Sequence, residues 1–148
     1  MTLAVDVAAE GVRVPIARAR VAELVRGVLR AERVRHAMIS VAFLDDRDIA
    51  RLNWRHLRHR GPTDVISFGL TGAPDGPVVG DIYIAPGVVR ANAHANGRPV
   101  REELARVVVH GVLHVLGHDH PEGEERLASP MWRRQERLLT RLAGAARA

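Results

Sequence analysis

The stretch VVVHGVLHVLGHDH, residues 107–120, holds four of the eight histidines in this 148-residue chain. We predict that its first part is helical and belongs to a helix that begins at Pro99. Because four residues of an α-helix advance about 400°, His110 and His114 point the same way, about one turn apart. Two unpaired imidazoles buried on this otherwise apolar helix would cost several kcal/mol. The pattern therefore predicts a bound group that satisfies both rings.

A third histidine, His120, follows at a distance that fits the same site. Gly117 is predicted to end the helix, because glycine tolerates positive φ, and the chain can then turn back. Three imidazoles bind zinc at about 2.0–2.1 Å each and leave a fourth position for water or substrate, as in catalytic zinc sites. We therefore predict one Zn²⁺ per chain, bound by His110, His114 and His120. His118 lies between ligands and is predicted not to be one.

The same spacing, H-x-x-x-H-x-x-G-x-x-H, is that of the metzincin proteases, so the predicted helix is zincin-like. Those enzymes need Glu directly after the first His, as the general base for the metal-bound water. This chain has Gly111 there, and glycine cannot take a proton. Peptidase chemistry by that mechanism is disfavoured. A zinc metallopeptidase-like hydrolase on small substrates stays an alternative, and a carboxylate within reach of the open metal position would favour it.

The composition predicts one soluble domain, residues 1–148, in the cytoplasm. Apolar residues make up 47% of the chain, and the absence of cysteine excludes disulfides and thiolate metal ligands. No signal-peptide pattern and no membrane-spanning apolar stretch is present, so no membrane partner is expected. The net charge is +5, and all 22 basic residues are arginine. This charge permits a polyanionic partner such as nucleic acid without establishing one.

The pattern of apolar residues and turn signals predicts an α/β (α+β) fold with about five helices. The two adjacent strands before the third helix favour a small, mixed, mostly parallel four-stranded sheet with one antiparallel member. The predicted strands cover residues 3–9, 38–44, 65–70 and 78–85, with a turn-rich loop at 71–77. The predicted helices run from Pro15 to about Arg33, from Asp45 or Asp46 past Leu57, from Pro86 to about Asn96, onward from Pro99, and from Met131 to Leu142.

Three blocks of the sequence resemble the YbeY family of bacterial rRNA maturation factors, which are described as metal-dependent endoribonucleases. The family hallmark H-G-x-L-H-L-x-G-Y-D-H resembles HGVLHVLGHDH here, residues 110–120. The family's L-N-…-T-D-V-L-S-F resembles LNWRHLRHRGPTDVISF, Leu52 to Phe68, and its G-D-I strand resembles residues 80–82. The blocks follow the family's order and span most of residues 50–120.

The resemblance implies a zinc-dependent endoribonuclease, specific for single strands, that matures the 3′ end of small-subunit rRNA and acts in ribosome quality control. It implies RNA, the small ribosomal subunit and assembly proteins as partners, and it matches the three predicted ligands to the family's zinc ligands. Two positions depart from the family. His118 stands where the family usually has tyrosine, and Leu57 falls, by ungapped counting, at an arginine thought to serve substrate or catalysis.

Arginines near the metal would bind phosphate, bidentately where the geometry allows. The candidates for substrate binding are Arg55, Arg58 and Arg60, which flank Leu57 and could replace the family's arginine. No protein general base is evident. The reacting group is predicted to be the metal-bound water, whose pKa zinc lowers toward 7. Asp119 is the candidate carboxylate that would accept a hydrogen bond from the free N–H of a ligating imidazole.

A further alternative is a ribosome-assembly or RNA-binding factor whose zinc mainly holds the fold. A fourth protein ligand that closes the metal site would favour this reading, because structural zinc is usually bound by four protein ligands. Basic residues around an open metal cleft would favour the ribonuclease. Trp54 and Trp132 could stack on bases, but the expectation is that both belong to the core.

Overall fold

The computed structural model describes the backbone of residues 1–70, 75–121 and 123–147, and side chains as far as residue 143. The order of elements agrees with the prediction, and residues 71–74 of the predicted loop 71–77 lie outside the described residues. The elements are β1 (Thr2–Ala9), α1 (Arg18–Ala31), β2 (His36–Phe43), α2 (Asp46–Leu57), β3 (Val65–Gly69), β4 (Val78–Ile84), α3 (Pro86–Ala95), α4 (Val100–Val115), the 3-10 helix η1 (Gly123–Ala128) and α5 (Pro130–Arg147).

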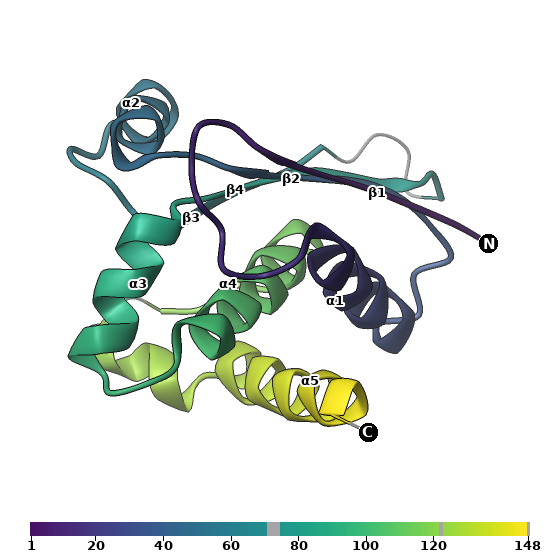
Figure 1. Cartoon of the computed structure of the whole chain (residues 1–148). Coiled ribbons are helices and arrows are strands. Elements are labelled where there is room, and N and C mark those ends of the chain that lie inside the picture. Colours follow the sequence, from purple (N-terminus) through teal and green to yellow (C-terminus); the bar gives the residue numbers. More distant parts are fainter. Residues whose placement is uncertain (71–74, 122, 148) are drawn as a thin grey trace.

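The four strands form one mixed sheet in the order β1-β2-β4-β3. β1 pairs with β2 and β2 with β4 in parallel, whereas β3 pairs with β4 antiparallel, which confirms the predicted sheet. Figure 1 shows α1, α4 and α5 on one side of this sheet and α2 on the other. In the part of the chain that the structure describes, no helix has the length and apolar character needed to cross a membrane.

Helix α4 lies at the centre of the molecule, between the sheet and α5 (Figure 1). It contacts β3 and β4 on one side and α1, α3 and α5 on the others. A helix that is apolar nearly all round is stable only when it is covered all round. The side chains of Leu104, Val108, Val109, Val112 and Leu113 are accordingly inaccessible to solvent. The core helix therefore carries two of the predicted metal ligands.

Two glycines allow α4 to lie close to the sheet. A Cβ at Gly111 would come within 2.9 Å of the Cγ2 atom of Ile82 on β4, and a Cβ at Gly80 would come within 2.4 Å of the Val115 side chain. Neither position leaves room for a larger residue without a shift of the neighbour. Gly111 is thus a packing residue, and a glutamate at this position would have to displace the side chain of Ile82.

Several boundaries differ from the prediction. Helix α1 runs from Arg18 to Ala31, so Pro15 lies ahead of it. It ends where Arg33 adopts a left-handed conformation (φ 61°), a stop that usually belongs to glycine and that the sequence therefore did not reveal. Helix α5 begins at Pro130, one residue earlier than predicted, and extends past Leu142. The short helix η1 was not predicted.

Candidate metal centre

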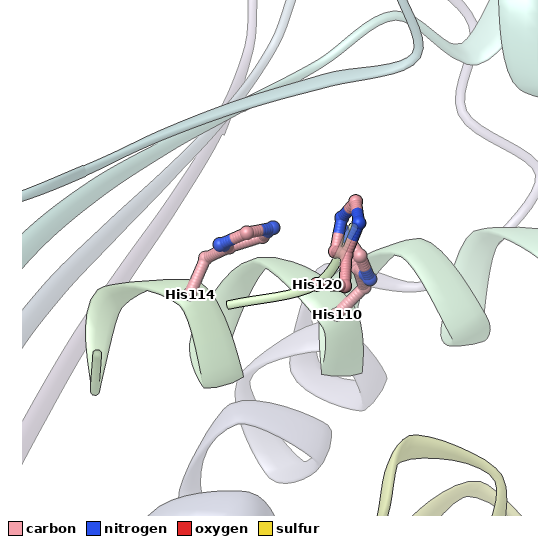
Figure 2. A group of neighbouring side chains, drawn as sticks. All are labelled: His110, His114 and His120. Carbon is pink, nitrogen blue, oxygen red and sulfur yellow. The ribbon is translucent and has the colours of Figure 1, made fainter. Parts of the chain in front are cut away.

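The three predicted ligands come together. The ring centroids of His110 and His114 are 4.6 Å apart, and that of His120 lies 5.1 Å from the first and 5.0 Å from the second. One ligand nitrogen from each ring lies within 4.8 Å of the others. Figure 2 shows His110 and His114 on one face of α4 and His120 on the segment that returns beside it. Three imidazoles in this arrangement can hold one metal ion.

The turn after α4 returns the chain to the metal centre. Gly117 has φ 96°, its N–H donates to the carbonyl of His114, and the N–H of His118 donates to the carbonyl of Leu113. These two bonds and the left-handed glycine form a Schellman motif. The predicted role of Gly117 as the helix terminator is confirmed. Because the motif reverses the chain within a few residues, His120 lies opposite the helix face that carries the other two histidines.

Two of the rings are oriented by hydrogen bonds on their Nδ1 side. The Nδ1–H of His110 donates to Oε1 of Gln135 on α5, at 2.6 Å. The Nδ1–H of His120 donates to the main-chain carbonyl of Pro121, at 2.9 Å. A carbonyl or amide oxygen only accepts, so Nδ1 carries the proton and Nε2 keeps its lone pair for a metal. This donor set fits a divalent ion such as zinc.

Burial favours the neutral form of His110 and His114. It lowers the pKa of His110 to about 4, and although the hydrogen bond to Gln135 opposes this effect, the neighbouring His114 and His120 add to it. Burial also lowers the pKa of His114. Two buried imidazoles are therefore unprotonated at neutral pH, which is the form that binds a metal.

Gln135 belongs to a chain of polar contacts that continues away from the metal centre. Its side chain is 1% exposed, and its Nε2–H donates to Oε2 of Glu136 at 3.1 Å. The guanidinium of Arg106 binds Glu136 through two nitrogens, at 3.0 and 3.1 Å, and also pairs with Glu103. Because the Glu136 carboxylate fixes the amide, Gln135 can present only its oxygen to His110.

A cavity of about 760 Å³ opens beside the three histidines. Its wall includes β3 from Val65 to Ser67, the histidine face of α4, and the start of α5 at Trp132 and Gln135. Asp64 also lines it, and burial raises the pKa of this carboxyl group. The cavity is also lined by three arginines and two exposed leucines. These residues are Arg98, Arg106, Arg126, Leu57 and Leu127.

The predicted substrate arginines are not in the cavity lining. Arg55, Arg58 and Arg60 are all exposed, whereas Leu57, which they flank, lies in the cavity wall. The guanidinium groups of Arg58 and Arg60 lie over the ring of Trp54, at 5.6 and 5.7 Å from its centroid. Their assignment to substrate binding stays a prediction.

Both tryptophans differ from the expectation that they belong to the core. Trp54 is 46% exposed, and Trp132 is half-buried in the cavity wall. Trp54 follows the buried Asn53 on α2 and falls on the outward face of that helix. Its size and aromatic character suggested burial, but the helical position decides the outcome.

The two remaining polar residues of the histidine block have different contacts. Asp119 accepts a hydrogen bond from the main-chain N–H of His120 at 2.9 Å, and its charge raises the pKa of His114 against the larger effect of burial. Its role as partner of a ligating imidazole stays a prediction. His118 binds Glu32 through Nε2 at 3.1 Å and does not line the cavity. The separation of His118 from the metal cluster agrees with the prediction.

Sequence reasoning missed two residues of the site. Gln135 lies 25 positions after His110, and only the packing of α5 against α4 brings them together. Arg126 lies on η1, which was not predicted. No local spacing connects either residue to the histidine block, so the sequence offered no signal for them.

The sequence profile of the family described as Endoribonuclease YbeY matches residues 6–143. The chain belongs to this family. A protein of Beutenbergia cavernae named Endoribonuclease YbeY is 39% identical over 88% of the chain and 93% of its own length. Relatives of the same name from Thermobifida fusca and Syntrophus aciditrophicus are 37% and 31% identical, over 83% and 97% of the chain and 84% and 92% of their own lengths.

A solved structure shares the architecture of this YbeY chain. The solution structure of a Thermotoga maritima protein matches it with a TM-score of 0.63 and 25% identity, over 97% of the chain and 91% of its own length. This likeness extends over almost the whole chain and agrees with the mixed sheet and central helix described above. The resemblance drawn from the three sequence blocks is confirmed.

Removing the hydrogen bond between Gln135 and His110 should lower the affinity of the site for a metal. Gln135→Met keeps the side-chain volume but removes the acceptor, so zinc affinity should fall about 10- to 100-fold. Competition with a chromophoric chelator would measure this. Leu138→Met, another volume-conserving change at a buried position of α5, should leave the affinity unchanged. Equal affinities for the two variants would show that Gln135 does not orient the ligand.

Proposed function

We propose that this YbeY-family chain is a zinc-dependent endoribonuclease that cleaves single-stranded RNA and matures the 3′ end of small-subunit rRNA. The observation that carries the proposal is the open His110–His114–His120 cluster in the wall of a large cavity. The relatives are named endoribonucleases, which supports RNA as the substrate. The expected partners are the small ribosomal subunit and its assembly proteins, so the proposed compartment is the cytoplasm.

The donor set supports zinc at this position, with one ion per chain. Three imidazoles, of which His110 and His120 keep the lone pair of Nε2, suit a borderline-soft divalent ion. When bound, zinc would supply a water of lowered pKa and a Lewis acid for a phosphoryl oxygen. The protein's own contribution is to orient the rings, through Gln135 and the Pro121 carbonyl, and to enclose the reacting phosphate in the cavity.

The two alternatives have weaker support. A mainly structural zinc would need a fourth ligand, but among the described residues the cluster contains only the three histidines. A zinc metallopeptidase-like hydrolase would need a carboxylate at the open metal position. Gly111 cannot provide one and is packed against Ile82. Asp64 lines the cavity, but its oxygen Oδ1 accepts from the N–H of Val65 at 2.8 Å.

We assign substrate binding outside the cavity to Arg55, Arg58 and Arg60. Their positions on both sides of the cavity-lining Leu57 support a role for these exposed guanidiniums at its rim. Asn53 donates from Nδ2 to the carbonyl of Gly61 at 3.0 Å, which holds the segment that follows α2. Basic residues beside an exposed aromatic ring are a combination that single-stranded nucleic acids bind.

Replacing a ligand tests the proposed activity. We expect His114→Ala to abolish both zinc retention and cleavage of a labelled single-stranded RNA, because two imidazoles hold zinc much more weakly than three. His118→Ala is the matched control. His118 lies four positions after His114, and its side chain binds Glu32 instead of facing the cluster. The His118→Ala variant should therefore keep stoichiometric zinc and full cleavage. Equal cleavage by the wild type and His114→Ala would refute the proposed site.

Loss of Arg55, Arg58 and Arg60, which we call the rim arginines, should weaken RNA binding in a salt-dependent way. Replacing Arg55, Arg58 and Arg60 together by glutamine should lower the slope of log K against log salt by up to about 2, since each phosphate contact contributes about 0.7. Fluorescence anisotropy with a short oligoribonucleotide at several salt concentrations measures this slope. A control triple variant changes three exposed arginines outside the cavity lining. These are Arg13, Arg30 and Arg35. If both triple variants changed the slope equally, the effect would be one of net charge alone.

A further inference from the structure

The three arginines in the cavity wall differ in how their charges are balanced. Arg106 is bound by the carboxylates of Glu103 and Glu136, and Arg98 pairs with Glu103 at 3.2 Å. The buried Arg106 is bound on several of its nitrogens and has little capacity left for an external anion, and one nitrogen of the exposed Arg98 is already paired with Glu103. In the described residues, no carboxylate lies within 4.0 Å of Arg126, although Glu124 and Glu125 precede it on η1. Neither glutamate lines the cavity.

The guanidinium of Arg126 is oriented by an aromatic ring. Its guanidinium lies over Trp132, 5.7 Å from the ring centroid, and both residues line the cavity. A cation over an aromatic face keeps its N–H donors free at the edge of the guanidinium plane. Arg126 is therefore oriented by Trp132 and can still bind an anion with its fork of donors.

Buried Ser129 fixes the backbone between these two residues. Its hydroxyl donates to the carbonyl of Arg126 at 2.7 Å and accepts from the N–H of Trp132 at 3.2 Å. Ser129 is thus the N-cap of α5 and joins η1 to this helix. Because α5 also supplies Gln135, the same helix orients a metal ligand and holds Arg126.

The charge of Arg126 acts inside the cavity. Burial raises the pKa of the cavity-lining Asp64, and the positive charge of Arg126 opposes this effect. Helix α2 contributes the apolar side chain of Leu57 to the cavity wall, and this side chain brings no charge.

We infer that Arg126, supported by Trp132, is the residue that binds a phosphate of the RNA strand beside the metal centre. The inference rests on the proposed ribonuclease function and assigns it a phosphate-binding residue inside the cavity. The rim arginines would then contact more distant phosphates, and Arg98 and Arg106 would remain structural. Arg126 is thus assigned substrate binding, whereas Trp132 positions it.

The test compares RNA binding by zinc-loaded Arg126→Gln with that of Arg137→Gln, an exposed position of α5 outside the cavity lining. With a short single-stranded oligoribonucleotide at 0.1 M salt, we expect Arg126→Gln to bind about tenfold more weakly, the effect of one charge-assisted hydrogen bond. The slope of log K against log salt should fall by about 0.7. Arg137→Gln should match the wild type, and zinc content should be equal in all three proteins.

A second variant separates the effect of the Arg126 charge from the effect of the Trp132 ring that orients it. Trp132→Leu keeps the charge of Arg126 but removes the aromatic face, so affinity should fall about two- to fivefold with an unchanged salt slope. Identical binding by Arg126→Gln and Arg137→Gln, in a wild-type protein that cleaves RNA, would overturn the assignment of Arg126 alone. A zinc-loaded wild type that neither binds nor cleaves the RNA would instead overturn the proposed function.

Discussion

The burial of α4 is the constraint on which the rest of this structure depends. The helix is covered by the sheet and by three other helices, and Gly80 and Gly111 let it lie close to β4. Polar side chains on such a helix need partners, because an unpaired imidazole in an apolar setting costs free energy. His110 and His114 meet this need by facing a cavity together, where His120 joins them. The histidine cluster that could hold a metal follows from the packing of the core helix.

The polar groups around the cavity divide into those that build the site and those left for a substrate. Arg106 pairs with both Glu103 and Glu136, and Gln135 connects this network to His110. A network in which each member is satisfied rigidifies its surroundings. Helix α5 therefore acts as the support of the metal centre, and the Ser129 cap at its start sets the position of Arg126.

Much of the fold and the grouping of the three histidines could be predicted from the sequence because both depend on local spacing. The i, i+4 histidines, the glycine stop and the strand patterns are all read within a few residues. Arg33, which ends α1 without glycine, and the short helix η1 gave no such signal. Gln135 and Arg126 reach the site only because α5 and η1 pack beside it. Long-range contacts of this kind produce no periodic pattern in the sequence. The exposure of Trp54 shows in the same way that helical position outweighs residue type.

The proposed metal centre is best tested by a crystal structure of the zinc-loaded protein, with anomalous scattering recorded at the zinc edge. We predict one zinc bound by imidazole nitrogens of His110, His114 and His120 at about 2.0–2.1 Å, with no fourth protein ligand and with the open position facing the cavity. A carboxylate of Asp64 or Asp119 in the fourth position, or zinc bound elsewhere, would contradict this prediction.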